Sequence, residues 1–329
     1  MNLAVVYLGK KIPTYVFRNL LYLKKTFPTE TVYFISDNQV ALNNAYEIGV
    51  QIFKASLTDE NSRNLKKRLS HPMGFRDGFW LHTTSRFFAI QEFSHFLNEP
   101  FIQIEADVFL FKSFPIRKLG EATKISFPLE TPNTGAASIF YVPSHRSISE
   151  FVSFILEMTD LNSLETDMTL LGKYWERYPE KVNILPSIAR QESIDERNRA
   201  VLAASEKLDY FQGLFDPLTY GMHLLGEDPM NARGWIKFGK KPYNHLISEL
   251  HLRFELNDDS LFLIQKENRY EIFCLHVHSK NLRMFRGKSF SREIHRGIKF
   301  ASREESRFMP KVFLRLAGKS LVRRYARAK

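Results

Sequence analysis

The stretch Phe101-Ile-Gln-Ile-Glu-Ala-Asp-Val-Phe-Leu-Phe111 has the pattern of a buried β-strand that carries two carboxylates, Glu105 and Asp107. Side chains two residues apart on a strand share a face, so the two acids are expected to point the same way. Burying unpaired charge is costly, and a divalent cation is a natural partner for paired carboxylates. The stretch therefore predicts a site for Mn²⁺ or Mg²⁺. Two solvated acids at an exposed strand end are the alternative.

Working outward from this strand, the first part of the chain alternates apolar runs with helical patterns. We expect strands at 3–8, 31–36 and 51–54 and a long helix at about 78–98. This alternation predicts a parallel sheet with helices on both faces, and ligands of such sheets bind beyond the carboxyl ends of the strands. Tyr7, Asp37 and the two acids fall at the carboxyl ends of three predicted strands, those at 3–8, at 31–36 and in the acidic stretch. They are therefore expected to meet at one edge of the sheet.

The pattern is less regular after Asp107. Further strands are expected at 124–129, 136–142, 182–186, 261–265 and 270–276, helices at 147–159 and 166–177, and a loop-dominated segment at 214–238. The predicted fold class is thus α/β, with a Rossmann-type mixed sheet flanked by helices. We place a single domain at 1–285, followed by a basic helical extension at 286–329.

Composition bounds the compartment and the partners. The 329 residues include one cysteine, Cys274, so an intrachain disulfide framework is excluded. The N-terminal apolar run is too short for a signal peptide, and no run of about 18 apolar residues is present, so we expect no transmembrane helix. A cytoplasmic protein is the expectation.

Positive charge is concentrated in the tail at 306–329, which has eight Lys or Arg residues and no acid, in a chain whose formal charge is +11. Basic residues recur there at every fourth position, as on one stripe of a helix: Arg307, Lys311, Arg315, Lys319 and Arg323. Such a segment, with apolar residues between the charges, suits an anionic surface at the inner face of a membrane. A solvated tail and a nucleic-acid partner are the alternatives. We expect no nucleic acid, because basic residues outside the tail are scattered.

Two helices carry further candidates for chemistry. Arg86 shares an inward-facing stripe with Ile90 and Phe93 in the helix before the acidic strand. An inward-facing Arg needs an anionic partner, so either a phosphate or a structural salt bridge is expected there. Asp167 lies at the start of another helix, where it is a candidate general base or sugar ligand, with helix capping as the alternative.

A third group of candidates lies towards the end of the predicted domain. His276 and His278 share one face at a strand end, where either a metal ligand or a routine polar edge is expected. Lys280 follows them as a candidate phosphate ligand. Asp216 belongs to a long polar segment of the kind that is often functional, together with His223, Glu227 and Asp228.

Taken in order, these motifs resemble the GT-A-fold glycosyltransferases that use nucleotide-sugar donors, of the bacterial surface-polysaccharide type. The resemblance covers roughly residues 1–285 and is carried by Glu105-Ala-Asp107 at the position of that fold's Asp-x-Asp motif, Asn133-Thr-Gly135, Glu165-Thr-Asp167 and His276-Val-His278-Ser-Lys280. The first acid of the motif is Glu105 rather than Asp. This departure leaves Asp107 as the stronger metal ligand.

The resemblance implies a UDP- or GDP-sugar donor, a glycan or lipid-linked acceptor and hexosyl transfer with either stereochemistry. Asp107 would bind Mn²⁺ or Mg²⁺, with Glu105 at the metal or the donor ribose and His278 or His276 completing the metal shell. The other expected roles are nucleotide binding by Tyr7 and Asp37, phosphate binding by Arg86 and Lys280, and catalysis by Asp167, facing the sugar or acceptor, and Asp216.

Two other functions are open. A sugar nucleotidyltransferase would share the sheet and the acidic metal site, but such enzymes usually have a glycine-rich phosphate loop after the first strand. Here that region, Gly9-Lys-Lys-Ile-Pro13, has one glycine. A non-catalytic, membrane-peripheral binding protein would keep the fold without the chemistry. Metal-dependent binding of a nucleotide sugar distinguishes an enzyme from such a protein.

Overall fold

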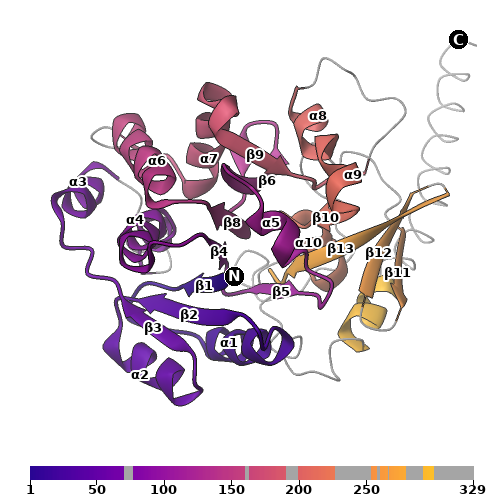
Figure 1. Cartoon of the computed structure of the whole chain (residues 1–329), viewed down its shortest axis with the longest axis horizontal. Helices are drawn as coiled ribbons and strands as arrows, with labels where there is room; N and C mark the ends of the chain where they lie inside the picture. Colours follow the sequence, from indigo (N-terminus) through magenta and orange to yellow (C-terminus); the bar gives the residue numbers. More distant parts are fainter. Residues whose placement is uncertain are drawn as a thin grey trace, which may run out of the picture.

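The computed structural model describes residues 1–69, 77–159, 163–189, 199–226, 253–257, 260–265, 267–278 and 292–299. Within them an eight-stranded mixed sheet and a five-stranded sheet lie beside each other, and helices flank the larger sheet (Figure 1). This architecture confirms the predicted α/β class with a mixed sheet. None of the described helices is both long and apolar enough to cross a bilayer.

The first half of the large sheet is parallel, as its alternating pattern predicts. Its strands are β1 (Asn2–Val6), β2 (Thr31–Ser36), β3 (Gln51–Lys54) and β4 (Phe101–Ile104), in the order β3-β2-β1-β4. All three pairings are parallel, so the carboxyl ends of these strands share one edge. Leu3, Ala4 and Val5 of β1 are fully buried, as expected for a parallel strand with both faces covered.

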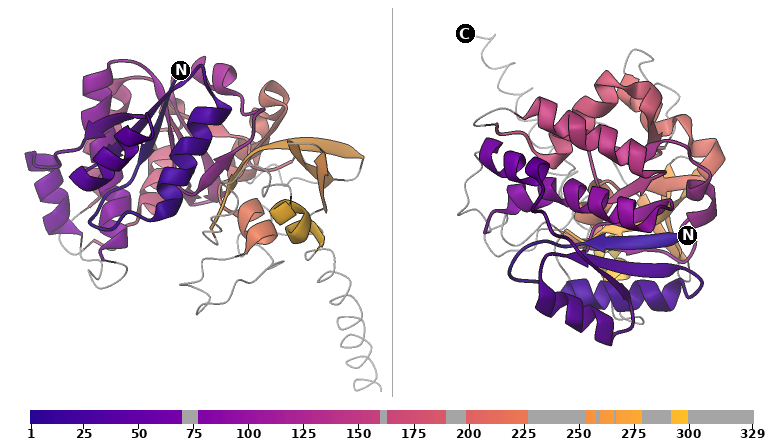
Figure 2. Two further views of the ribbon diagram at one scale, coloured as in Figure 1. Left: turned by 90° about the horizontal axis from the view of Figure 1, so that it is seen from below. Right: turned by 60° about the vertical axis from the view of Figure 1, so that its left-hand side comes forward.

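Helices cover both faces of this parallel half (Figure 2). One face carries α1 (Thr14–Thr26) and α2 (Gln39–Glu47), and the other carries α4 (Phe79–Leu97), with α3 (Glu60–Arg68) beside it. α4 begins after Gly78 and ends before Asn98, both in left-handed backbone conformations, at the limits that the sequence predicts. Phe93 of α4 packs on Phe101 of β4, with ring centroids 5.0 Å apart. α4 thus lies directly over the strand that leads to the acids.

The acidic stretch at 101–111 is not one strand, which corrects the sequence prediction. β4 ends at Ile104, the next three residues turn the chain, and β5 (Val108–Leu110) belongs to the second sheet. A hydrogen bond from the amide of Val108 to the carbonyl oxygen of Glu105, 3.0 Å long, closes the turn. A strand buried on both faces would have had to bury the two acids among apolar residues, whereas the turn brings them to the sheet edge.

The second half of the large sheet contains the antiparallel pairings. Its strands are β6 (Ile125–Thr131), β7 (Thr134–Gly135), β8 (Ile139–Val142) and β9 (Val182–Leu185), and the helices of this region are α5 (Ile116–Gly120), α6 (His145–Met158) and α7 (Asp167–Arg177). β8 is antiparallel to both β4 and β6, so β4 and β6 run the same way, and β9 is parallel to β6. The carboxyl ends of β6 and β9 therefore lie at the same edge as that of β4.

The second sheet combines β5 with strands from the C-terminal part of the chain. These are β10 (Gly213–Phe215), β11 (Arg253–Asn257), β12 (Ser260–Gln265) and β13 (Asn268–His276), and α8 (Arg199–Glu206), α9 (Leu208–Phe211) and α10 (Thr219–Leu225) belong to the same region. β10 and α10 correct the prediction of a loop-dominated segment at 214–238. α10 forms because the Asp216 carboxylate accepts the amides of Tyr220 and Gly221 at its start, 2.9 and 2.7 Å away.

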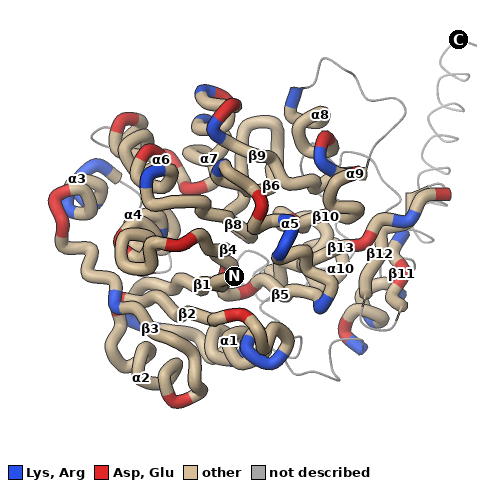
Figure 3. The backbone as a smooth tube through the Cα atoms, in the orientation of Figure 1, with Lys and Arg blue, Asp and Glu red and all other residues tan. Residues whose placement is uncertain are grey.

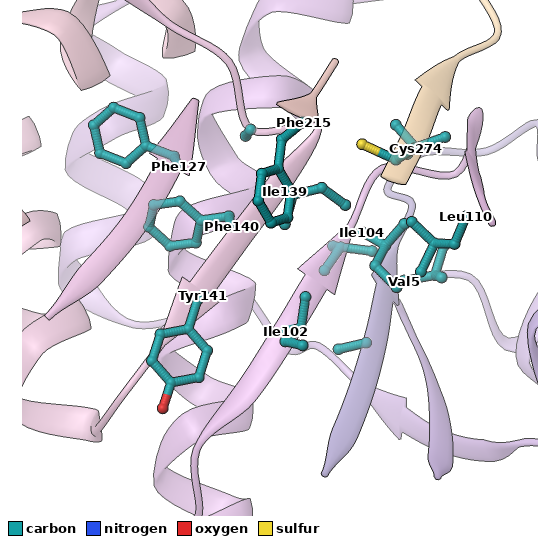
Figure 4. Close-up of a cluster of buried hydrophobic side chains, with 14 of the residues drawn as sticks. Val5, Ile102, Ile104, Leu110, Phe127, Ile139, Phe140, Tyr141, Phe215 and Cys274 are labelled. Carbon is teal, nitrogen blue, oxygen red and sulfur yellow. The ribbon is translucent and has the colours of Figure 1, made fainter. Parts of the chain in front are cut away.

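One apolar core joins the two sheets. Figure 4 shows Ile102 and Ile104 of β4 beside Ile139 of β8, with Leu110 and Cys274 from the second sheet close to them. All five side chains are fully buried. Leu110 of β5 and Cys274 of β13 are paired in register, so this core fixes β13 relative to the acidic turn. The predicted boundary at residue 285 stays a prediction, and the tail at 306–329 lies outside the described residues.

Candidate functional site

The loops after β1 and β2 are tied together at the shared strand edge. The Asp37 carboxylate accepts a hydrogen bond of 2.9 Å from the amide of Gly9, and the Ser36 hydroxyl donates to the carbonyl oxygen of Tyr7 across 2.7 Å. Gly9 has φ +109°, a conformation that glycine adopts readily. The structure thus brings Tyr7 and Asp37 to the edge where the sequence predicts them. Asp37 is exposed there.

Glu105, Asp107 and His276 form the group of possible metal ligands within the described part of the chain. One donor atom from each lies within 4.8 Å of the others. His276 Nε2 is 3.3 Å from Asp107 Oδ2 and 3.7 Å from Glu105 Oε2. Neighbouring ligands around an ion bound at about 2.1 Å are separated by about 3 Å, so this spacing fits a small divalent cation. The pairing of β5 with β13 brings these residues together across the chain.

The orientation of the His276 ring supports this fit. Its Nδ1 lies 3.2 Å from the carbonyl oxygen of Pro217, which can only accept a hydrogen bond. In the neutral ring Nδ1 therefore carries the proton, and the lone pair of Nε2 faces the two carboxylates. Three acceptor atoms then converge on one point, which is the arrangement a cation needs. His278, the alternative ligand, lies outside this group, with its ring centroid 6.0 Å from that of His276.

Arg86 lies between two carboxylates. The guanidinium pairs with Glu105 Oε1 and, across 2.7 Å, with Asp167 Oδ2, and all three side chains are largely buried. Burial acts to lower the pKa of Arg86, but Glu105 and Asp167 outweigh it and raise this pKa above its ordinary value. Of the two partners that the sequence leaves open, the structure has the salt bridge. Arg86 thereby links the acidic turn to the start of α7.

Asp167 begins α7 while Thr166 caps the helix, with its hydroxyl accepting from the amide of Thr169. Burial raises the pKa of Asp167, and the charge of Arg86 opposes this effect. Because the cap is Thr166, Asp167 is not needed as the capping residue. Its carboxylate instead belongs to the buried network that includes Glu105.

Asp216 occupies a different position from the one expected of a catalytic group. The side chain is fully buried, and besides the two amides of α10 it accepts the amide of His276, across 3.0 Å. Burial raises its pKa, while these backbone hydrogen bonds lower it. A carboxylate engaged by three backbone donors is occupied in holding its neighbours. These hydrogen bonds join the start of α10 to the backbone of His276, and the catalytic role expected of Asp216 stays a prediction.

Glu130 is a residue of this region that the sequence reasoning missed. It lies near the carboxyl end of β6, at the same edge as Glu105, and its carboxylate is 3.4 Å from the Thr219 hydroxyl. Burial, with a contribution from the charge of Asp216, raises the pKa of Glu130 to about 8. The available signal was an acid directly after a predicted strand, at 124–129, which is a pattern similar to that of Glu105. Lys280, the other predicted phosphate ligand, lies outside the described residues, as do Glu227 and Asp228.

Comparison with known proteins finds glycosyltransferases among solved structures. The chain is similar to mouse xyloside xylosyltransferase 1 in its apo form, with 11% identity over 64% of this chain and 93% of that chain and a TM-score of 0.38. It is also similar to the galactosyltransferase LgtC in complex with donor and acceptor sugar analogues, with 10% identity over 61% and 83% and a TM-score of 0.40. No family model and no curated protein matches the sequence.

A third similar structure is a glycosyltransferase involved in glycosylation of the major capsid of PBCV-1, with 13% identity over 56% of this chain and 81% of that chain and a TM-score of 0.32. These similar structures are glycosyltransferases, the class of protein that the motifs resemble. At these identities and TM-scores the likeness says nothing of donor, acceptor or mechanism, and the function proposed below rests on the residues of this chain.

Proposed function

We propose that this protein is a glycosyltransferase that moves a sugar, most simply a hexose, from a nucleotide-sugar donor to a glycan or lipid-linked acceptor. The observation that carries the proposal is the convergence of Asp107 Oδ2, Glu105 Oε2 and His276 Nε2 at the carboxyl edge of the sheet. Nucleotides bind at such edges in sheets of this kind. The negative charge of a nucleoside diphosphate is neutralised by a divalent cation or by basic side chains.

Asp107 and His276 would hold the ion, with Glu105 as a weaker third ligand because Arg86 occupies its other oxygen. Oxygen ligands alone suit Mg²⁺, and an imidazole nitrogen among them favours Mn²⁺. The bound ion would supply Lewis-acid neutralisation of the departing nucleoside diphosphate. A UDP- or GDP-sugar remains the proposed donor, with Tyr7 and Asp37 at the nucleotide.

The buried network would position the sugar. Arg86 and Asp167 carry hydrogen-bonding groups beside the metal ligands, and hydroxyl groups of a sugar are suited to both. Glu130 contacts a different group, the Thr219 hydroxyl of α10, and the charges of Asp216 and His276 influence its pKa. It is therefore our candidate for contact with the acceptor hydroxyl, where a weakly acidic carboxyl could act as a general base.

We further propose that the enzyme works at the inner face of a membrane in surface-polysaccharide synthesis, held there by the basic tail at 306–329. The support is the charge of the tail, with eight basic residues and no acid. A sugar nucleotidyltransferase is less well supported because the loop after β1 has a single glycine. A non-catalytic binding protein is less well supported because Glu105, Asp107 and His276 lie close enough together to hold an ion.

The test is thermal stability against a panel of nucleotides and nucleotide sugars, with Mn²⁺ or with EDTA. A ligand that binds only the native state raises the melting temperature. We expect one nucleotide class to do so in the presence of Mn²⁺, and this shift to disappear in Asp107→Ala. Glu47→Ala, at an exposed position of α2, is the matched control. Absence of any shift, with slow donor hydrolysis also undetectable, would contradict the proposal.

A further inference from the structure

The helix at 292–299 has two chemically different faces. Its exposed residues recur at intervals of three and four and are all basic or potentially so: Arg292, His295, Arg296 and Lys299. Glu293 and Ile294 are buried, so the single acid of this helix is not part of the exposed face. Elsewhere in the described chain, Lys and Arg are interspersed with Asp and Glu (Figure 3). The helix at 292–299 therefore presents a small basic surface, which we call the basic face.

This helix is fixed to the domain that carries the metal ligands. A Cβ atom at Gly297 would lie 2.1 Å from the carbonyl oxygen of Leu224, so the helix backbone packs directly on that of α10. The helix, in yellow, and α10 lie side by side in Figure 2. On α10 itself, a Cβ at Gly221 would lie 2.0 Å from the carbonyl oxygen of His276. Close backbone contacts thus run from the basic face to the metal site, which a flexible attachment would not give.

The sequence that follows indicates the kind of partner. The tail at 306–329 has eight basic residues and no acid, and between the basic residues it places Phe308, Val312, Phe313, Leu314, Leu316, Leu321 and Val322. A bilayer surface has anionic headgroups for the charges and an acyl boundary for the apolar side chains. A nucleic acid would match the charges but would leave most of these apolar side chains in water.

We infer that the basic face at 292–299 is a docking surface for anionic phospholipid headgroups, and that it holds the folded domain against the membrane at a fixed orientation. The basic face acts in addition to the tail at 306–329. Because the basic face is a rigid part of the domain, its binding also fixes the orientation of the domain. Only the consequence for catalysis rests on the proposed function. A domain held in one orientation would keep the proposed metal site at a constant distance from the membrane that carries a lipid-linked acceptor. Headgroup binding itself needs neither donor nor metal.

The test is co-sedimentation of the full chain with vesicles of phosphatidylcholine containing one-third phosphatidylglycerol, against vesicles of phosphatidylcholine alone. The variant is Arg292→Gln/Arg296→Gln/Lys299→Gln. Each basic residue near an anionic surface strengthens binding about five-fold, so removing three is expected to weaken partitioning roughly 100-fold even with the tail present. Melting temperature and Mn²⁺-dependent nucleotide binding, measured on the same preparations, are expected to stay unchanged because these residues lie outside the metal site.

The matched control is Arg63→Gln/Lys66→Gln/Lys67→Gln on α3, which removes the same charge from three exposed positions far from the basic face (Figure 1). It is expected to bind vesicles like the unmodified chain. Equal losses in the two variants would show a non-specific effect of net charge and overturn the inference. So would unchanged binding in the 292–299 variant, or binding of the chain to a single-stranded oligonucleotide but not to anionic vesicles.

Discussion

At the scale of single residues, the three proposed metal ligands differ in the partners that they already have. Asp107 Oδ2 faces His276 Nε2 at 3.3 Å, whereas Glu105 is shared with Arg86. A ligand whose charge is already partly neutralised contributes less to binding a cation. The first acid of the motif is Glu105 rather than Asp, and in the structure this residue is paired with Arg86.

We expect Asp107→Asn to weaken Mn²⁺ binding by at least about 100-fold and Glu105→Gln by about 10-fold, the range seen when groups around a metal are removed. Titration of the metal-free protein with Mn²⁺, followed by calorimetry or by electron paramagnetic resonance, measures both. Equal losses would mean that Glu105 is as strong a ligand as Asp107. Asp37→Asn, at the same edge but outside the ligand group, is the control and should bind normally.

Glu130 predicts a pH dependence of stability. Its pKa in the folded protein is raised to about 8, from an ordinary value of 4.5, so between these pH values the folded state holds a proton that the unfolded state has released. The free energy of unfolding therefore falls as pH rises from about 4.5 to 8. Urea unfolding of the metal-free protein across this range should show a flatter dependence for Glu130→Gln, which gains stability relative to the unmodified chain at pH 8. If stability falls equally with pH in Glu130→Gln and in the unmodified chain, the pH dependence does not come from Glu130. Glu47→Gln is the control and should leave the dependence of stability on pH unaltered.

At the scale of elements, α10 supports the strand end that carries His276, a proposed metal ligand. Asp216 joins the start of this helix to the amide of His276, and Gly221 allows the helix to approach the end of β13. Hydrogen bonds to a charged acceptor contribute about 1.5–3 kcal/mol each, and three donors are involved here. The position of an imidazole at one strand end thus depends on a short helix elsewhere in the chain.

We expect Asp216→Ala to reduce the free energy of unfolding by about 3–5 kcal/mol, because three buried amides lose their acceptor. Denaturant unfolding measures this, and Asp37→Ala, which removes a single hydrogen bond of an exposed carboxylate, should cost less than about 1 kcal/mol. If the two substitutions cost the same, Asp216 does not hold these elements together.

Gly221→Ala should disturb the same support by a different route. The added methyl group meets the backbone of His276, which cannot move aside freely, so overpacking of about 1–3 kcal/mol and a weaker Mn²⁺ affinity are expected. Gly120→Ala is the matched control, because its methyl group would meet only the flexible end of Met1. Calorimetric melting with and without Mn²⁺ separates the two variants; a Gly221→Ala protein with normal metal affinity would contradict the contact.

At the scale of the whole molecule, the sequence predicts the parallel half of the fold well. Strong alternation and local turn signals place β2, β3 and α4 almost to the residue, and the carboxyl-edge rule correctly predicts that Tyr7, Asp37 and Glu105 lie at one edge. The same local signals cannot predict that the acidic stretch breaks after Ile104 and continues in another sheet. That break is determined by the partner strand β13, which lies far away in sequence.

The candidate site also combines residues that local sequence patterns reveal with residues that only long-range contacts bring together. Asp107 and Arg86 are identifiable because each belongs to a clear local pattern. The place of His276 beside the two acids, and the hydrogen bonds of Asp216, depend on contacts among β5, β13 and α10, which sequence periodicity does not record. Glu130 was missed because the predicted strand stopped at Leu129, one residue short of it.

A metal ion at this site would join the two sheets. Local opening of backbone hydrogen bonds should therefore become slower in the segments that the ion connects. We expect Mn²⁺ to slow hydrogen exchange in β5, β13 and the acidic turn, which it links, and to leave β3 and α2 unchanged. Mass spectrometry of exchanged peptides measures the pattern. The Asp107→Ala protein should show no such protection, and uniform protection of the whole chain would contradict a site at this junction.

The pairing of β5 with β13 also has a consequence for how the protein is made. Asp107 and His276 are separated by 169 positions, so a chain leaving the ribosome displays its two acids long before it can supply the imidazole. Closing so distant a contact is slow, and until then the unpaired edge of β5 is open to wrong partners. The juxtaposition of these residues therefore requires that synthesis and folding have both reached β13. A shortened or misfolded product would carry the two acids without His276 beside them, and under the proposed function it would be inactive.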